Sequence, residues 1–202
     1  FSSRRRHTRF RNVTGVQTCA LPILPSNVEL GFNELSMYTS PTAITYPNGC
    51  HICEIEVDPE TGTHEVINYV VVDDVGIVIN PMLLKGQIQG GIAQGLGQAV
   101  MENIAYDNET GQLLSASFMD YAMPRATDLC SIEVKSSPVP TKNNPLGVKG
   151  AGEAGCVGAL PCVLNALDDA LAPVGVVHIE MPATPERIWK AIREAPSRSS
   201  AG

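Results

Sequence analysis

One glutamate, Glu153, stands in a glycine-rich stretch that carries no other charge, and it is the first candidate for chemistry. The stretch, Gly150-Ala-Gly-Glu-Ala-Gly155, lies among small and apolar residues. A general base needs a pKa raised toward the working pH, and burial among such residues would raise it. A carboxylate near the start of a helix is instead stabilised by unpaired N–H groups and the helix dipole, which lower its pKa. The residues alone leave both roles open.

The same stretch has the letter pattern G-x-G-x-x-G, which is typical of dinucleotide-binding loops. Such a loop follows directly on an apolar strand, opens a helix and is followed about 20 residues later by an acidic residue. The segment before Gly150, PVPTKNNPLGVK, holds three prolines, and Asp168 and Asp169 come too early. An NAD(P)-binding dehydrogenase module is therefore an alternative that a strand ahead of Gly150 would support.

A second glycine-rich element, residues 82–104, has apolar residues every four positions, which predicts a helix. Each interior glycine costs about 1 kcal/mol relative to alanine, so close approach to another backbone or to a bulky ligand must offset the cost. Glutamine amides in this element donate and accept hydrogen bonds, which suits the edge of a heterocycle. A glycine-rich packing face with solvated glutamines is the alternative. These residues are Gly86, Gly90, Gly91, Gly95 and Gly97, with Gln87, Gln89 and Gln94.

The other elements frame these two segments. Alternating residues predict a β-hairpin with strands over residues 50–58 and 64–75, joined by the turn PETGT. A short strand over 131–140, a loop over 141–155, a helix over 156–171 with Pro161 near its first turn and a strand over 174–180 follow. A last helix is expected over 184–195, with Thr184 as N-cap and Pro185 as its first residue. Strands and helices in this order indicate a mixed sheet with helices, an α+β fold.

Charge and cysteine content exclude several classes of protein. Beyond residue 24 the chain holds nine basic and 21 acidic side chains, a net charge of −12, so no nucleic acid or anionic lipid partner is expected. No apolar run reaches about 20 residues, so no membrane span is expected. Six scattered cysteines favour a reducing, cytoplasmic location. Cys50-His-Ile-Cys53 opens an alternating run and fits strand cysteines better than a structural zinc site, which needs four ligands.

The two ends of the chain differ from its body. Residues 13–23, VTGVQTCALPI, match a common sequencing adapter translated in frame, and residues 1–23 as a whole are basic and lack a clear period. We interpret residues 1–23 as a non-native, disordered artefact. Residues 24–195 form the native body, and residues 196–202 are expected to be a disordered tail.

Three motifs of the body resemble the C-terminal region of molybdenum hydroxylase large subunits, the family of xanthine dehydrogenase, aldehyde oxidoreductase and aerobic carbon monoxide dehydrogenase. The motifs are DDVGIVINPMLLKGQIQGGIAQGLGQAV, GQLLSASFMDYAMPRATDL and NPLGVKGAGEAGCVGALPCVLNAL, and the resemblance runs from about Tyr46 to Ile192. It implies that residues 24–195 are the C-terminal part of a larger molybdopterin-binding domain.

The resemblance also implies roles for both glycine-rich segments. Glu153 matches the family's base, which removes a proton from the metal-bound hydroxyl before its oxygen attacks an electrophilic carbon. The metal is held by the dithiolene of the pterin, so no protein ligand to it is expected. Contacts to the pterin cofactor are implied for Gly90, Gly91, Gln94 and Gly95, and the loop residues Lys149, Gly150 and Gly152 would help to hold it.

The implied cofactor is molybdenum–molybdopterin in its cytosine dinucleotide form, with iron–sulfur clusters and FAD on partner subunits or missing domains. The carbon monoxide branch usually has serine after the glutamate, whereas this chain has Ala154. The expected small-molecule substrate is therefore an aldehyde or an N-heterocycle. A fragment of this length is expected to be inactive alone, and a non-catalytic structural fragment is the remaining alternative.

Overall fold

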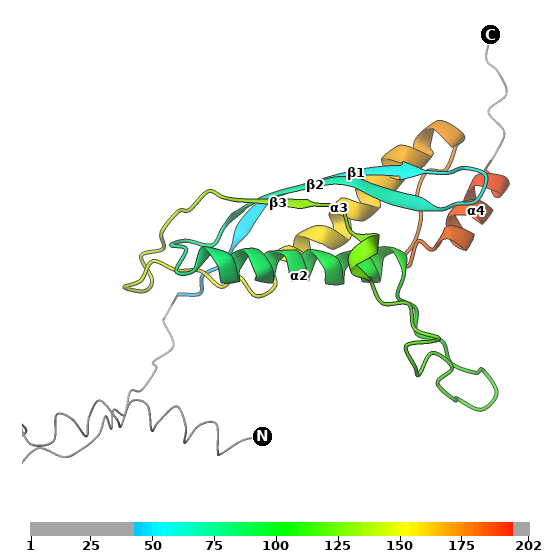
Figure 1. Ribbon diagram of the computed structural model, residues 1–202, viewed down its shortest axis with the longest axis horizontal. Coiled ribbons are helices and arrows are strands. Elements are labelled where there is room, and N and C mark those ends of the chain that lie inside the picture. The colour runs from blue at the N-terminus through cyan, green and yellow to red at the C-terminus, as the bar shows by residue number, and fades with distance from the viewer. Residues whose placement is uncertain (1–42, 196–202) are drawn as a thin grey trace, which may run out of the picture. The chain divides into compact units, whose positions relative to one another are not determined.

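Residues 43–195 are described by the computed structural model, and the interpretations of residues 1–23 and 196–202 concern parts of the chain outside this range. The predicted α+β class is confirmed, because helices cover one face of a small mixed sheet (Figure 1). In chain order the elements are β1 (Asn48–Val57), β2 (His64–Asp74), α2 (Pro81–Val100), the 3-10 turn η2 (Ala126–Asp128), β3 (Ile132–Ser136), α3 (Ala154–Leu171), the 3-10 turn η3 (Ala172–Val174) and α4 (Pro185–Glu194).

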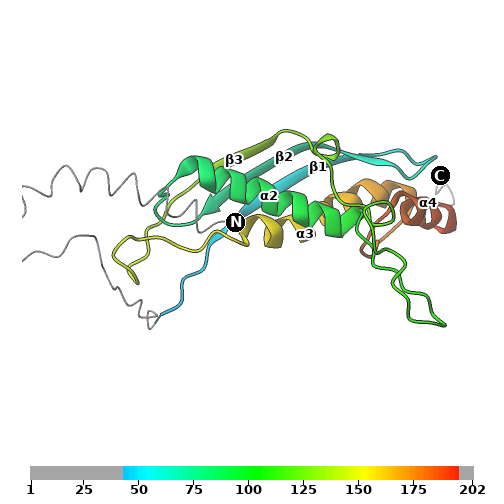
Figure 2. The ribbon, with the colours of Figure 1, turned by 60° about the horizontal axis from the view of Figure 1, so that its bottom comes forward.

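The sheet has the strand order β1–β2–β3. The predicted hairpin is confirmed, since β1 runs antiparallel to β2, while β3 runs parallel to β2 on its other side. Gly62 closes the hairpin turn with φ of +74°, a conformation that favours glycine. The parallel pairing requires the chain to leave the sheet after β2 and return, and α2 lies on that excursion (Figure 2).

A β-bulge decides which side chains of β2 face the helices. The register shifts between Glu54 and Ile55, so Ile67 has no partner residue on β1. Alternate residues of a strand point to opposite faces, and the shift exchanges the two faces at this point. The buried residues of β2 are Val66 before the bulge and Tyr69, Val71, Asp73 and Asp74 after it.

Helices α2 and α3 pack closely because glycines line their contact. A Cβ atom on Gly91 would lie 2.9 Å from the backbone nitrogen of Cys156, and one on Gly95 would lie 2.7 Å from the Cβ of Ala159. A Cβ on Gly155 would lie 2.3 Å from a backbone oxygen of α2. Close helix packing therefore accounts for these glycines. The core beneath holds residues spaced by four along both helices: Ile88, Ile92, Leu96 and Val100 of α2, and Ala159, Val163, Leu167 and Leu171 of α3.

The helix ends follow the capping residues of the sequence. Asn80 caps α2 by accepting a hydrogen bond from the N–H of Leu83 at 3.1 Å, and Pro81 takes the first helical position. The predicted last helix is confirmed with Thr184 as its N-cap. Helix α3 begins two residues earlier than predicted, which places Pro161 in its interior rather than in its first turn.

The predicted strand over residues 174–180 is wrong. Residues 176–180 join no strand of the sheet. The N–H of Ile179 donates to Oδ1 of Asp168 at 3.1 Å, and the N–H of Val176 donates to the carbonyl of Leu171 at 3.3 Å. These bonds satisfy backbone groups that a strand would have paired in a sheet.

One helix within residues 43–195 has the length and composition of a membrane span. The segment Ala154–Val174, with a mean hydropathy of 1.3, meets that criterion, which corrects the expectation that no segment would. One face of α3 packs against α2 and β1, and 22% of the segment is buried.

Candidate functional site

Glu153 occupies the N-cap position of α3, where the loop after β3 meets the helix. Its side chain makes no capping hydrogen bond and is exposed, while its backbone carbonyl accepts the N–H of Val157 at 3.0 Å. Helix geometry therefore fixes the backbone of Glu153 but not its carboxylate. The carboxylate is available to a group outside the helix.

Two side-chain contacts hold the loop that carries Glu153. Nε2 of Gln87, on α2, donates to the carbonyl of Gly152 at 3.0 Å. The Nζ atom of Lys149 donates to Oδ2 of Asp74 at 2.5 Å, and the Lys149 N–H donates to the carbonyl of Val75 at 2.8 Å. The loop is thus tied to the first turns of α2 and to the end of β2.

Asp74 is the centre of the second contact. Besides Lys149, its carboxylate accepts the backbone N–H groups of Gly76 and Val139, each at 2.9 Å. The hydrogen bond from Lys149 first, and these two N–H groups next, hold the pKa of Asp74 well below its usual range. A carboxylate that stays charged and satisfied in this way keeps three chain segments together.

A cavity of about 330 Å³ opens beside Glu153. Its walls come from the start of β1, the end of β2 and the first turns of α3. On its floor, Nε2 of His51 lies 3.6 Å from Oδ1 of Asp73, and Nδ1 of His51 lies 2.8 Å from the hydroxyl of Tyr69. The lining residues are Tyr46, Pro47, Asn48, Gly49, His51, Asp73, Glu153, Ala154, Val157 and Gly158.

The residues that the sequence assigned to a cofactor fall into three groups. Gly91 and Gly95 are buried against α3, so neither presents a surface to a ligand. Gly90 and Gln94 are exposed on α2, and added Cβ atoms on Gly90, Gly150 and Gly152 would meet no atom within 4 Å. The side chain of Lys149 is engaged by Asp74. The open positions thus lie on α2 and on the Glu153 loop.

Sequence reasoning missed three side chains near Glu153: His51, Asp73 and Asp74. A signal was present in the hairpin, whose register pairs Gly49 with Asp73 and His51 with Val71. Diagonal neighbours on one face of an antiparallel pair lie close together, so the register alone places His51 beside Asp73. The amide of Gln87, rather than that of Gln94, contacts the loop of Glu153.

The cysteines of the CxxC pair lie in β1, as predicted. Cys50 is exposed, while Cys53 turns inward and hydrogen-bonds Cys162 of α3. This bond, followed by burial, raises the pKa of Cys53, and it lowers the pKa of Cys162 to about 7. Within residues 43–195, no group of three or more His, Cys, Asp or Glu side chains is arranged to hold a metal ion.

The dinucleotide alternative lacks the element that would support it. Strand β3 ends at Ser136, and residues 137–153 form a loop in which Val148 makes only an isolated bridge to Gly76. No strand of the described chain leads into Gly150, so the first glycine does not follow a strand as that fold requires.

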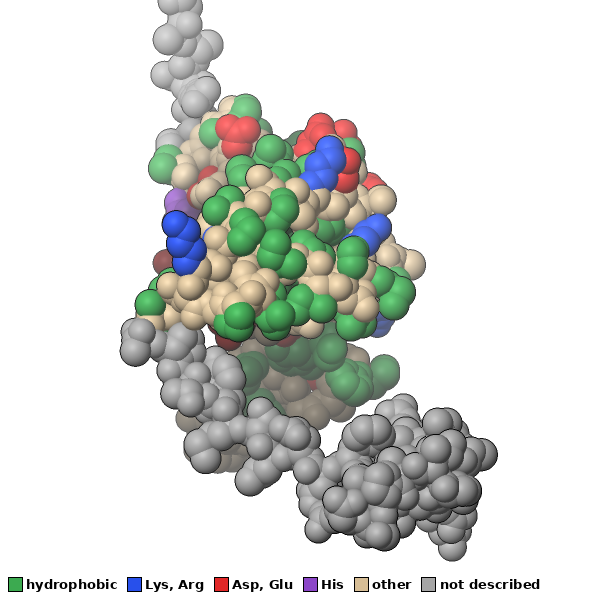
Figure 3. Space-filling view, turned by 90° about the vertical axis from the view of Figure 1, so that its left-hand side faces the viewer, with side chains coloured by type: hydrophobic (Ala, Val, Ile, Leu, Met, Phe, Trp, Pro, Cys, Tyr) green, Lys and Arg blue, Asp and Glu red, His purple; other side chains and the backbone are tan. Residues whose placement is uncertain are grey.

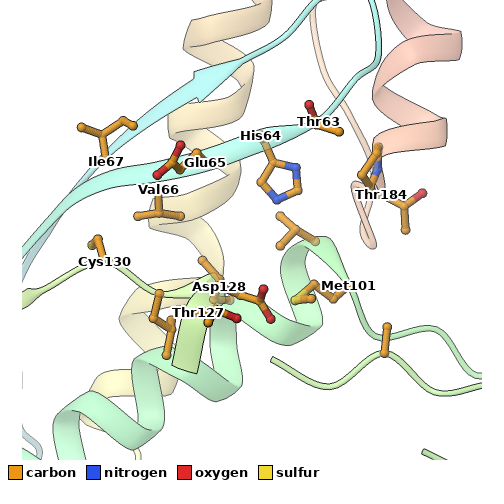
Figure 4. A pocket seen from close by; sticks show the side chains of 15 residues that line it. Thr63, His64, Glu65, Val66, Ile67, Met101, Thr127, Asp128, Cys130 and Thr184 are labelled. Carbon is orange, nitrogen blue, oxygen red and sulfur yellow. The ribbon is translucent and has the colours of Figure 1, made fainter. Parts of the chain in front are cut away.

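A second, larger cavity of about 660 Å³ lies where β2 begins, beside the end of α2 and the start of α4 (Figure 4). None of the predicted site residues lines it. His64 points into this cavity in Figure 4, its Nδ1 atom is buried without a hydrogen-bond partner, and burial lowers its pKa. Because His64 and Asp74 are the two ends of β2, this cavity is separate from the one beside Glu153.

Comparison with known proteins agrees with the family resemblance of the three sequence motifs. The model of the molybdopterin cofactor-binding domain matches residues 26–130. The carbon monoxide dehydrogenase large chain of Afipia carboxidovorans is 38% identical over 82% of this chain and 20% of its own length. The nicotine 6-hydroxylase large subunit of Paenarthrobacter nicotinovorans is 42% identical over 73% of this chain and 18% of its own length.

Solved structures give the same result. Quinoline 2-oxidoreductase from Pseudomonas putida 86 superimposes with a TM-score of 0.77 and 36% identity, over 93% of this chain and 24% of its own. A Cu,Mo-containing CO dehydrogenase superimposes with a TM-score of 0.73 and 38% identity, over 83% of this chain and 21% of its own. The chain thus spans about a fifth of the length of the curated relatives that it matches. It belongs to the molybdenum hydroxylase family, as a portion of the molybdopterin-binding large subunit.

Proposed function

We propose that the complete large subunit is a molybdenum-dependent oxidoreductase that hydroxylates a carbon atom of an aldehyde or an N-heterocycle with oxygen from water. The observation that carries this proposal is the exposed carboxylate of Glu153, which makes no capping hydrogen bond and lines a cavity. Two contacts, from Gln87 and Lys149, hold the loop beneath that carboxylate. A carboxylate on a fixed backbone, free of a structural partner, can act as a general base once the cofactor and the rest of the large subunit bury it.

The residues around Glu153 fit a molybdopterin cofactor. Gly90, Gly150 and Gly152 leave open space where side chains would otherwise stand, so a bulky planar group could approach both backbones. Gln94 is exposed on the same helix as Gly90 and offers an amide that both donates and accepts. We propose that these four residues contact the cofactor, and that Gly91, Gly95 and Lys149 support the cofactor-binding surface from below.

The bound cofactor, proposed to be in its cytosine dinucleotide form, would supply a centre that accepts two electrons. The chain's own contribution is the proton step. A carboxylate oxygen of Glu153 takes up the proton that the attacking, water-derived oxygen gives up. Ala154 and Val157 bring no second charge beside Glu153 on this turn of α3.

The relatives guide the substrate class. Two proteins similar to this chain are named for N-heterocycles, nicotine and quinoline, and the chain has Ala154 after the glutamate. These observations favour an N-heterocycle or an aldehyde. Oxidation of carbon monoxide is the second candidate, because the carbon monoxide dehydrogenase large chain is 38% identical. Turnover of the complete enzyme on quinoline, benzaldehyde and carbon monoxide separates these classes.

The surface around the start of α2 has features of a contact surface for another part of the same subunit. Figure 3 shows this end of the described chain, where hydrophobic side chains gather and charged ones lie toward the rim. Ile79 and Met82 are 72% and 76% exposed there, and an exposed apolar patch marks an interaction surface. We propose that the rest of the large subunit covers this end. Iron–sulfur and FAD subunits or domains would then receive the electrons, in a cytoplasmic complex without nucleic acid or membrane partners.

Substitution of Glu153 tests the proposed function. In the complete large subunit with its partners, Glu153→Gln should reduce kcat by at least about 10²-fold, because the base is lost. Its molybdenum content should remain that of the wild type, because the substitution removes a charge without filling space. Glu133→Gln, which removes an exposed carboxylate on β3, is the control and should keep full activity. Near-normal turnover of Glu153→Gln would remove the base from the mechanism, and a purified subunit without molybdenum would favour a structural role.

A further inference from the structure

Two thiols that are far apart in the sequence meet between the sheet and α3. Cys53 comes from β1 and Cys162 from α3, and both pack against the core that the sheet and the helices share. The two side chains are in hydrogen-bond contact, so their sulfur atoms lie next to one another. Both residues are only partly buried, which lets a small solute approach the pair. Neighbouring sulfur atoms on side chains that point toward one another are what a disulfide needs.

Cys162 is the hydrogen-bond acceptor of the pair. A hydroxyl has one proton, so the Tyr69 hydroxyl, which donates to Cys162, accepts from Nδ1 of His51 at 2.8 Å. The hydrogen bond from Cys53 first, and then that from Tyr69, lower the pKa of Cys162 to about 7 against the opposing effect of burial. About half of this thiol is therefore ionised at neutral pH, whereas an ordinary cysteine is only a few per cent thiolate.

Cys53 is the protonated partner. Its hydrogen bond to Cys162, followed by burial and by the charge of Cys162, raises its pKa, so Cys53 keeps its proton while Cys162 is ionised. Two of these causes come from the thiolate of Cys162, and both end when that sulfur is oxidised. The two thiols are thus suited to react in order, with Cys162 attacking an oxidant and Cys53 then attacking Cys162.

We propose that Cys53 and Cys162 are a site of reversible oxidation by hydroperoxides, and that the product is a disulfide joining β1 to α3. The thiolate of Cys162 attacks one oxygen of hydrogen peroxide, the O–O bond breaks, and hydroxide leaves, which gives a sulfenic acid. The sulfur of Cys53 then attacks the sulfenic sulfur. The S–S bond forms as the S–O bond breaks, and the departing hydroxide takes the proton of Cys53. Both sulfurs are oxidised, the peroxide is reduced to two molecules of water, and a thiol reductant restores the pair.

The test is peptide mapping of the complete large subunit under non-reducing conditions after treatment with hydrogen peroxide. The reduced subunit is freed of reductant, exposed to peroxide at pH 7 for increasing times, and its remaining thiols are blocked with N-ethylmaleimide. A peptide pair linked through Cys53 and Cys162 should appear, and dithiothreitol should abolish it.

Cys50, which is exposed on the same strand as Cys53, is the internal comparison. Cys162 should be lost about threefold faster than an ordinary exposed thiol such as Cys50, because about fifteenfold more thiolate outweighs an about fivefold lower nucleophilicity. This comparison is made in the wild type, so it does not depend on whether a variant folds. The proposed hydroxylation plays no part in it, so the outcome is independent of Glu153.

Two serine variants separate the two steps. In Cys53→Ser, Cys162 should still react, and dimedone should trap its sulfenic acid without a disulfide. Cys50→Ser is the matched control and should form the disulfide at the wild-type rate. A Cys162 that stays reduced after Cys50 is lost would overturn the proposal, as would a sulfenic acid at Cys162 that persists beside a free Cys53. A disulfide of Cys162 with Cys130 in place of Cys53 would overturn it as well.

Discussion

Close packing of α2 on α3 predicts that alanine at Gly155 will destabilise the fold. The added Cβ would lie 2.3 Å from the carbonyl oxygen of Ile88 and 3.1 Å from the backbone nitrogen of Ile92. Both atoms belong to the backbone of α2, so no change of rotamer relieves the overlap. The two helices would have to separate by about 1 Å to restore ordinary van der Waals contact.

The magnitude follows from two opposing terms. Overpacking of a well-packed contact costs about 1–3 kcal/mol, whereas replacing glycine by alanine in a helix gains at most about 1 kcal/mol. The gain is smaller at Gly155, which lies in the first turn of α3. We therefore expect a net loss of about 1–2 kcal/mol, which corresponds to a Tm lower by about 2–8 °C for a chain of this size.

Gly90→Ala is the matched control, because a Cβ atom at Gly90 would meet nothing within 4 Å. There the helix-propensity term acts alone, and Tm should rise by about 2–4 °C. The assay is thermal and urea unfolding of the 202-residue chain, followed by far-ultraviolet circular dichroism. If Gly155→Ala and Gly90→Ala shifted Tm in the same direction, the close approach of the two helices would not explain the glycine.

Further predictions concern a cap, a histidine and a thiol. Asn80→Ala removes the cap of α2 and should lower the free energy of unfolding by about 1 kcal/mol in urea titrations; an unchanged midpoint would contradict this. The hydrogen bond with Asp168 raises the pKa of His178 above 6.5, so this pair stabilises the fold below that pH and the contribution is lost as pH rises through the folded-state pKa. An NMR titration should show this elevation, and Asp168→Asn should abolish it. Iodoacetamide should label Cys162 with a half-maximal rate near pH 7, and Cys53→Ala should move that midpoint upward in mass-spectrometric assays.

The sequence predicts the hairpin and helices well because their signals are local. Alternation along β1 and β2 and the cap at Thr184 each act within a few residues. The prediction of a strand over residues 174–180 was wrong because alternation shows only that a segment is extended. Its backbone found a partner in the side chain of Asp168, and no local pattern reports a bond of that kind.

The site was predicted unevenly for a related reason. Glycine spacing on α2 shows that something approaches closely, but it does not distinguish a neighbouring helix from a ligand. Only the three-dimensional arrangement separates Gly91, which contacts α3, from Gly90, which faces open space. The sequence did not predict that Asp73 lies in the site. Its Oδ2 atom is buried without a hydrogen-bond partner, and only the folded structure shows this.

The parallel pairing of β2 with β3 has a consequence for how the protein is made. Roughly 60 residues separate paired positions such as Tyr69 and Ile132, so during synthesis β2 waits several seconds for its second neighbour. Until then the β1–β2 hairpin presents an open strand edge with Val70 and Val72 beside it, which is a template for aggregation. We expect the nascent chain to need a chaperone during this interval, and truncations that end before Ile132 to be recovered as insoluble protein.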